Sequence, residues 1–303
     1  MSIVEKAAEK LKTSQPEPQA FVVDEATASA QSAPTLERLQ ERMRVVDEPA
    51  DTAPLLHVDQ LRLERAGLSP VEDDAAGRLE DELRRVKRPL LDNVSGKSDR
   101  VPAHAERIVV SSAVPGEGKT FTAVNLALSF AREPDFEVLL VDGDIPKSDV
   151  TRVLGLEGRP GLMDLLVDER RPIADVILRT DIPNLLVVPS GHHHPLASEL
   201  FGGRHMEYVL DALAGPGRRR LVVFDSSPLL ATSESQVLAS HMGQVVMVVA
   251  AGRTRRLEVE SALQCLNGSS YVGLILNKSR LPASENHHYG YYGYYSRSRD
   301  QEV

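Results

Sequence analysis

A glycine-rich loop that ends in lysine and threonine carries the strongest chemical signal in this sequence of 303 residues. The loop occupies residues 113–120 and reads AVPGEGKT. It matches the phosphate-binding pattern G-x-x-x-x-G-K-[ST], except that alanine stands in place of the first glycine. Gly116 and Gly118 would let backbone N–H groups face a phosphate, and the dipole of a following helix would add to the attraction. Lys119 can then reach the β and γ phosphates of a nucleotide while the Thr120 hydroxyl binds Mg²⁺.

Three aspartates follow apolar runs at positions that could serve a nucleotide and its metal ion. Asp142 and Asp144 are two residues apart, so their side chains lie on the same side of an extended chain. One can orient Mg²⁺ or its water shell while the other accepts a proton from an attacking hydroxyl. Asp225 ends a later apolar run, where a carboxylate is costly to bury unless it meets a cation, for which Mg²⁺ is the natural choice. A solvated Asp-rich turn is the alternative for the first two.

The hydrophobic pattern around these residues predicts an α/β doubly wound domain with a mostly parallel sheet. Apolar runs of strand length occupy residues 108–110, 138–141, 185–188, 221–224, 245–249 and 272–276. Their hydrophobicity is continuous, which is typical of strands covered on both faces by helices. Helical patterns at residues 119–132, 196–214, 232–241 and 256–267 alternate with these runs. Because ligands bind at the carboxyl ends of such strands, the loop and the aspartates are expected to meet there.

The remaining sequence differs in composition on either side of this domain. Residues 1–75 are rich in Ala, Pro, Glu, Gln and Ser and are predicted to be largely disordered, with short helices. A stronger helix is predicted at about residues 75–87, ended by Pro89. We place the nucleotide-binding domain at residues 76–280, with a helix at 76–88 as its first element, and a tail at residues 281–303.

The tail holds five of the seven tyrosines of the chain. They are Tyr289, Tyr291, Tyr292, Tyr294 and Tyr295. Gly290 and Gly293 separate them, and a segment of this kind cannot form a core strand. Aromatic residues are scarce in polar tails, so clustered phenolic hydroxyls beside a nucleotide site suggest phosphate acceptors. A low-complexity stacking or aggregation segment is the alternative.

Composition excludes several classes of function. A net charge of −9 argues against a nucleic-acid partner, which requires a concentrated basic surface. Cys265 is the only cysteine, so there is no disulfide framework or cysteine metal site, as in a reducing cytoplasm. No run approaches the roughly 18 apolar residues of a membrane span, so we expect any membrane role to come through a partner. The run of residues 192–194, three histidines, suggests metal binding, but exposed loop histidines are the favoured interpretation.

These motifs and the tyrosine cluster resemble the bacterial tyrosine kinases of exopolysaccharide and capsule synthesis, from about residue 78 to the C-terminus. The Walker A, Walker A′ and Walker B motifs of that family are similar to residues 113–120, 139–147 and 221–228. Within the family, the sequence is similar to the exosortase-associated tyrosine autokinases. The basic residue of Walker A′ is usually arginine, which Lys147 only approximates. The resemblance implies a P-loop NTPase of the partition-ATPase-like group that uses ATP and Mg²⁺.

The resemblance also implies roles for individual side chains. Lys119 and Thr120 hold phosphates and Mg²⁺, Asp142 and Asp225 support the metal ion, and Asp144 is the base for a tyrosine hydroxyl. The implied catalytic set is Lys119, Asp142, Asp144 and Asp225, the implied Mg²⁺ ligands are Thr120, Asp142 and Asp225, and the implied nucleotide-binding residues are Pro115, Gly116, Glu117, Gly118, Lys119, Thr120, Phe121 and Asn277. Asn277, after the last apolar run, is a candidate for contact with the adenine.

The family has an E-x-x-R-x-x-R helix at its subunit contact, which residues 82–88 match. Glu82, Arg85 and Arg88 then share one helical face, for which an ordinary solvated charged face is the alternative. The implied assembly is a ring-like homo-oligomer in which one subunit phosphorylates the tail of its neighbour. Each phosphotyrosine adds about −1.5 to −2 charges, so phosphorylation should disfavour assembly. The implied location is the cytoplasmic face of the membrane, with a separate transmembrane co-polymerase as activator and room for a cognate phosphotyrosine phosphatase.

Two other functions remain open on the sequence. A partition-type ATPase would be a nucleotide-switched dimer without kinase activity, but such proteins carry an extra lysine where this chain has Val114, and they lack a tyrosine tail. A non-catalytic adaptor that binds ATP and docks on a polysaccharide-export protein could keep every motif intact.

Overall fold

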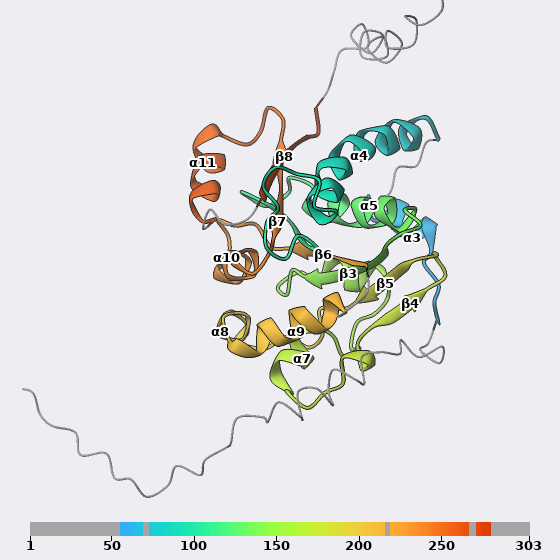
Figure 1. Ribbon diagram of the computed structural model, residues 1–303, viewed down its shortest axis with the longest axis vertical. Coiled ribbons are helices and arrows are strands. Elements are labelled where there is room, and N and C mark those ends of the chain that lie inside the picture. The colour runs from blue at the N-terminus through green and yellow to red at the C-terminus, as the bar shows by residue number, and fades with distance from the viewer. Residues whose placement is uncertain (1–54, 69–72, 216–218, 267–270, 280–303) are drawn as a thin grey trace, which may run out of the picture. The chain divides into compact units, whose positions relative to one another are not determined.

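A single sheet of eight strands runs through the computed structural model, which describes residues 55–68, 73–215, 219–266 and 271–279 (Figure 1). The strands are β1 (Leu55–Leu56), β2 (Arg107–Ser112), β3 (Glu137–Gly143), β4 (Leu178–Thr180), β5 (Leu185–Val188), β6 (Arg220–Ser226), β7 (Gln244–Ala250) and β8 (Tyr271–Asn277). Their order across the sheet is β1-β4-β5-β3-β6-β2-β7-β8. Every neighbouring pair is parallel except β4 and β5. The predicted fold class and all six predicted strands are therefore confirmed.

The helices cover both faces of the sheet. They are α3 (Gln60–Arg65), α4 (Asp73–Val94), α5 (Lys119–Ala131), α6 (Asp149–Val153), α7 (Leu162–Val167), α8 (Ala197–Phe201), α9 (Arg204–Ala214), α10 (Ser233–Ser240) and α11 (Arg256–Gln264). On one face, α5 packs against β2, β3 and β6, with α4 against α5. On the other face, α7 and α9 contact β3 and β6. None of the helices in the described ranges is long and apolar enough to cross a membrane.

Sheet register explains why the three aspartates meet. The strands β3 and β6 pair so that Asp142 lies beside Asp225, and β2 pairs with β6 so that Val110 lies beside Asp225. All of these strands are buried along almost their whole length, which matches their continuous apolar sequences. The carboxyl ends of β2, β3 and β6 therefore form one edge, from which the polar side chains of the site project.

The prediction that Pro89 ends the helix near residue 87 is wrong. The helix α4 continues through Pro89 to Val94, although an internal proline costs about 3 kcal/mol in a free helix. Contacts with the rest of the protein hold its last turns in place. Leu90 is buried in the core, and the Asn93 side-chain amide donates to Gln244 Oε1 at 2.7 Å. Tertiary packing thus outweighs the local preference.

Two further boundaries differ from the sequence predictions. The single helix predicted at residues 196–214 is two helices, α8 and α9, because Gly202 and Gly203 separate them and Gly203 has the extended backbone of a helix N-cap. In addition, β1 and α3 belong to the sheet and its covering layer although they precede the predicted domain start at residue 76. The tail at residues 281–303 lies outside the described residues.

Candidate nucleotide and magnesium site

The glycine-rich loop joins β2 to α5, as the sequence predicts. Gly118 is the N-cap of α5 and has a left-handed backbone with φ of 100°. A side chain at this position would also collide with Asn277, because a Cβ atom would lie 2.2 Å from its Nδ2 atom. Only glycine satisfies both conditions. Since no side chain caps α5, its first backbone amides are available to a phosphate.

The Glu117 side chain braces this loop from inside the protein. It is buried, and its Oε2 atom accepts a hydrogen bond from the Val114 amide at 2.7 Å. Its Oε1 atom accepts from the Ala250 amide at 3.1 Å and from the Thr254 hydroxyl. Glu117 is one of the expected nucleotide-binding residues, and in the structure its carboxylate ties the loop to the end of β7 and to Thr254. The sequence gives no sign of this role, because the partners lie more than 130 positions away.

The end of β8 holds the outer side of the loop. The Asn277 side-chain amide donates to the Glu117 carbonyl at 2.8 Å, and Lys278 Nζ donates to the Gly116 carbonyl at 2.6 Å. The structure thus brings Asn277, the candidate for contact with the adenine, to the phosphate-binding loop. Lys278, which follows Asn277 at the end of the same strand, adds a cation close to the candidate phosphate position.

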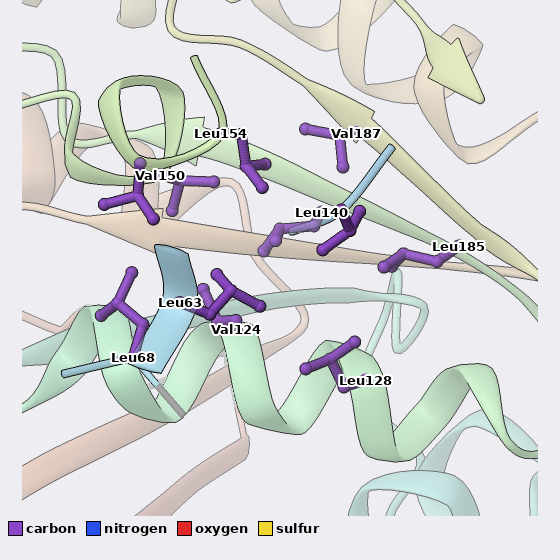
Figure 2. Close-up of a pocket in the computed structure, with 11 residues that line it drawn as sticks. Leu63, Leu68, Val124, Leu128, Leu140, Val150, Leu154, Leu185 and Val187 are labelled. Carbon is purple, nitrogen blue, oxygen red and sulfur yellow. The ribbon is translucent and has the colours of Figure 1, made fainter. Parts of the chain in front are cut away.

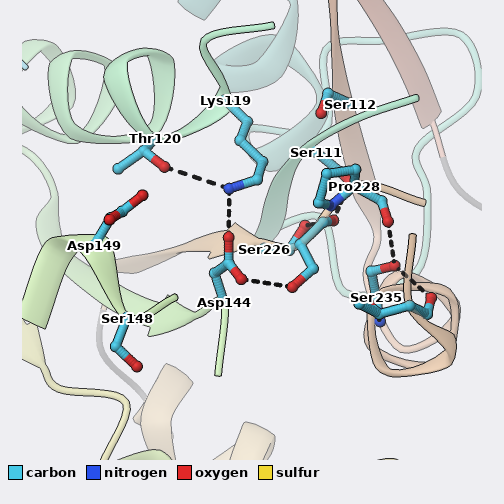
Figure 3. Close-up of polar contacts among 12 residues, drawn as sticks. Ser111, Ser112, Lys119, Thr120, Asp144, Ser148, Asp149, Ser226, Pro228 and Ser235 are labelled. Carbon is cyan, nitrogen blue, oxygen red and sulfur yellow. Dashed lines mark hydrogen bonds and ion pairs between the residues drawn. The ribbon is translucent and has the colours of Figure 1, made fainter. Parts of the chain in front are cut away.

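A buried ion pair joins the loop to the candidate base. The Lys119 ammonium lies 2.5 Å from Asp144 Oδ2, and Figure 3 shows it between Asp144 and Thr120. The other oxygen, Asp144 Oδ1, accepts from the Ser227 hydroxyl at 2.6 Å. Burial lowers the pKa of Lys119, but the neighbouring carboxylates of Asp225 and Asp144 outweigh it, so that the pKa is raised. Lys119 is therefore charged, and Ser227 is a site residue that the sequence prediction missed.

Asp142 is held firmly by donors from α6. Its Oδ2 atom accepts from the amide and the hydroxyl of Thr151, at 2.8 and 2.7 Å. Its Oδ1 atom accepts from the Asp144 amide at 3.3 Å. Burial raises the pKa of Asp142 to about 6, and the Thr151 hydrogen bonds limit that rise. Thr151 thus fixes the orientation of Asp142 through Oδ2, while Oδ1 has only the long contact with the Asp144 amide.

Asp225 is fully buried, and neither of its carboxylate oxygens has a hydrogen-bond partner among the described residues. Burial raises its pKa to about 8, although the nearby Lys119 ammonium opposes the rise. An unsatisfied buried carboxylate is costly, so it marks a position that a cation would stabilise. Mg²⁺ is typically held by one or two carboxylates together with substrate phosphates. Asp225 and the Thr120 hydroxyl fit this requirement.

The described residues contain no cluster of three or more histidine, cysteine or acidic side chains that could hold a metal ion alone. The Mg²⁺ site would therefore be completed by the phosphates of a nucleotide. His192, from the histidine run, lies on a loop with its Nδ1 atom 2.8 Å from Asp164 Oδ1 of α7.

An open cavity of about 410 Å³ adjoins these groups. Its lining residues are Gly67, Leu68, Gly116, Gly118, Lys119, Thr120, Phe121, Lys147, Asp149, Asn277 and Lys278. Most of the expected nucleotide-binding residues line this cavity, and Lys147, to which the sequence assigns no role, lines it as well. Pro115 lies on the loop but is exposed outside the lining. The presence of Gly67 and Leu68 was not expected from the sequence.

The other predicted residues lie elsewhere. Glu82, Arg85 and Arg88 are exposed on α4. No ion pair joins any of the three to another residue in the described ranges. The five tail tyrosines lie outside the described residues.

Comparison with known proteins identifies the family. A family model described as an AAA domain matches residues 105–255. Tyrosine-protein kinase YwqD of Bacillus subtilis is 32% identical over 196 residues, which cover 64% of this chain and 80% of that protein. Tyrosine-protein kinase CpsD of Streptococcus agalactiae is 29% identical over 207 residues, or 68% of this chain and 86% of that one.

Solved structures agree with these relatives. The chimerical protein CapA2B2 has a TM-score of 0.58 and 25% sequence identity, and the match covers 81% of this chain and 99% of that chain. The region that the family model matches contains the phosphate-binding loop and the three aspartates. The relatives confirm the resemblance to the bacterial tyrosine kinases. The chain therefore belongs to the family of bacterial tyrosine-protein kinases.

Proposed function

We propose that the protein is an ATP-dependent tyrosine autokinase that phosphorylates the tyrosine cluster of a neighbouring subunit. One observation carries this proposal. The Asp144 carboxylate, a candidate base, is ion-paired with the phosphate-binding Lys119, and both lie beside the unsatisfied carboxylate of Asp225. A group that accepts a proton, a group that binds phosphate and a group that binds Mg²⁺ thus share one buried edge of the sheet.

The ion pair suggests how nucleotide binding would prepare the base. In the structure the Lys119 ammonium neutralises Asp144. The phosphates of ATP would compete for that ammonium and leave Asp144, still oriented by Ser227, free to accept the proton of a tyrosine hydroxyl. The phenolic oxygen then forms a bond to the γ-phosphorus, the bond from that phosphorus to the β–γ bridging oxygen breaks, and ADP leaves. Thr120 and Asp225 would hold Mg²⁺, which would help to neutralise the charge of the phosphates.

The experiment that tests this function is incubation with ATP and Mg²⁺, followed by mapping of phosphate along the chain. A kinase transfers phosphate to the tail, and the acceptors we propose are the five tyrosines from Tyr289 to Tyr295. A partition-type ATPase would release inorganic phosphate and leave the tail unmodified. An adaptor would bind ATP and do neither. The three candidate functions thus give three different results.

We further propose that the exposed charges on α4 form a contact between subunits. Charge reversal by Arg85→Glu with Arg88→Glu is expected to reduce an oligomer to monomers. The two new glutamates would face Glu82 on the other subunit, and the like charges would repel each other. Light scattering or sedimentation measures the change in mass. The same substitution at Arg159, an exposed loop residue, should leave the mass unchanged. An oligomer that survives the double reversal would show that this face is only a solvated surface.

The cellular role that we propose rests on the family resemblance. The kinase would regulate exopolysaccharide polymerisation or export from the cytoplasmic face of the membrane, through a separate transmembrane co-polymerase that activates it. Phosphorylation of the five tail tyrosines would add roughly −7 to −10 charges per subunit at about −1.5 to −2 each, enough to disfavour a ring of such tails. A cognate phosphatase would then restore assembly, and an association with an exosortase system is part of the same proposal.

A further inference from the structure

We propose that the N-terminal arm, residues 55–68, is a wall of the nucleotide site, so that nucleotide binding and attachment of the arm to the sheet stabilise each other. This inference rests on the proposed use of a nucleotide. It arises because Gly67 and Leu68 line the same cavity as Lys119 and Thr120, although more than 40 positions separate them in the sequence. The arm is fixed at three places.

The first attachment is at the edge of the sheet. Strand β1 pairs with β4, and the Asp181 amide donates to the Leu56 carbonyl at 3.0 Å. The Asp181 carboxylate in turn accepts from the Val58 amide at 3.0 Å and contacts the His57 ring. The Val58 hydrogen bond holds the pKa of Asp181 below its ordinary value, so this carboxylate is ionised at neutral pH. One exposed side chain thus secures the chain as it leaves β1.

The second attachment is the apolar side of α3. Asp59 caps its N-terminus by accepting from the Leu61 amide at 2.9 Å. At its C-terminus the Gly67 amide donates to Glu64 and the Leu68 amide donates to Leu63, the hydrogen-bond pattern of a Schellman motif. The motif turns Leu68 back beside Leu63, and both are buried.

Figure 2 shows how Leu63 and Leu68 pack. They belong to an apolar cluster that also includes Val124 of α5, Leu140 of β3 and Val150 of α6. The side chains leave a cavity of only about 20 Å³, lined solely by apolar residues. The arm is therefore packed into the same hydrophobic core that supports the phosphate-binding helix.

The third attachment connects the arm directly to that helix. The Asn125 side-chain amide donates to the Leu68 carbonyl at 2.7 Å and to the Phe121 carbonyl at 2.8 Å. Phe121 lies next to Thr120 and also lines the cavity. The end of the arm is thus held against the first turn of α5, whose amides face the candidate phosphate position.

This arrangement has a thermodynamic consequence. A nucleotide that contacts the attached arm binds better to that state than to a state in which the arm is detached, so it shifts the equilibrium toward attachment. By reciprocity, attachment of the arm strengthens nucleotide binding by the same factor by which the nucleotide strengthens attachment. A variant whose arm is detached in a large share of molecules therefore binds the nucleotide more weakly. The arm therefore contributes to the affinity of the site from outside the phosphate-binding loop and the three aspartates.

The test compares nucleotide binding by three variants of the full chain. Leu63→Ala removes a buried anchor, and Asp181→Ala removes an exposed anchor remote from the cavity lining. Leu61→Ala is the matched control, because this side chain lies on the same helix and is 59% exposed. Calorimetric titration with Mg²⁺ and a non-hydrolysable ATP analogue should show that Leu63→Ala weakens binding about tenfold, a typical coupling. Asp181→Ala should weaken it by a smaller factor, and Leu61→Ala should not change it.

Hydrogen exchange provides the second measurement. In the unmodified protein the analogue should slow exchange of the Val58, Leu63 and Leu68 amides. If both anchor variants bind as tightly as the unmodified protein and these amides exchange at the same rate with and without the analogue, the inference is overturned. The outcome is independent of the proposed kinase activity. Loss of affinity in the anchor variants would uphold the inference even if no phosphate reached the tail, and an unaffected affinity would leave tail phosphorylation standing.

Discussion

Lys119→Met is expected to reduce phosphorylation of the tail by a factor of about 10² to 10³ or more, the effect of removing one charge-stabilising donor from an active site. The Lys119 ammonium is the buried cation at the phosphate-binding loop, and it forms an ion pair with Asp144. Methionine has a similar length but cannot neutralise a phosphate. Phosphate incorporation measured with labelled ATP gives the size of the loss.

Stability must be separated from activity in this variant. Removing one partner of a buried ion pair leaves the other charge uncompensated, which costs roughly 3–5 kcal/mol. The double variant Lys119→Met with Asp144→Asn removes both charges and should regain much of the stability without regaining activity. Lys97→Met alters an exposed lysine and should behave like the unmodified protein. If the double variant phosphorylates the tail normally, neither side chain has the proposed role.

Asp225→Asn is expected to make the metal-free protein more stable. The same substitution is expected to abolish activity. Burial raises the pKa of Asp225 to about 8, against an ordinary value of 3.8. Between these values the unfolded chain has lost the proton while the folded chain keeps it. The folded state therefore binds more protons, so the free energy of unfolding falls as the pH rises toward 8, by about 1.4 kcal/mol per pH unit at most. Asparagine does not titrate and escapes this loss.

The measurement is chemical denaturation without metal at pH 6 and at pH 8.5. The stability advantage of Asp225→Asn should grow between the two, and a constant difference would contradict the raised pKa. Addition of Mg²⁺ and an ATP analogue should stabilise the unmodified protein, because the ion meets the two unsatisfied oxygens. The variant should gain much less. Equal gains would exclude Asp225 as the metal ligand.

The sequence predicts the centre of the molecule well. The continuous apolar runs of β2, β3 and β6 leave no alternative to buried parallel strands, and the residues that follow such strands must meet at one edge. Lys119, Asp144 and Asp225 are therefore found where the sequence places them. For these residues, local pattern and global fold agree.

What the sequence does not predict depends on contacts between distant segments. The arm has only two residues in β1 and six in α3, and a helix of that length is unstable alone, so its structure depends on packing against the sheet. The same holds for α4 beyond Pro89, which needs the partner Gln244. Glu117 and Ser227 look like ordinary loop residues until β7 and Asp144 are brought beside them. Such roles cannot be read from spacing.

The measurement that tests the central claim most directly is phosphate transfer between two different subunits. A donor chain would keep the intact site but carry phenylalanine at Tyr289, Tyr291, Tyr292, Tyr294 and Tyr295, and the acceptor would be Lys119→Met with its tail intact. After the two are mixed with ATP and Mg²⁺, mass spectrometry of the tail peptides should find phosphotyrosine on the acceptor. Transfer between subunits would be contradicted if the acceptor tail stays unmodified in the mixture while the unmodified protein phosphorylates its own tail under the same conditions. The kinase function itself would be contradicted if neither the mixture nor the unmodified protein contains phosphotyrosine.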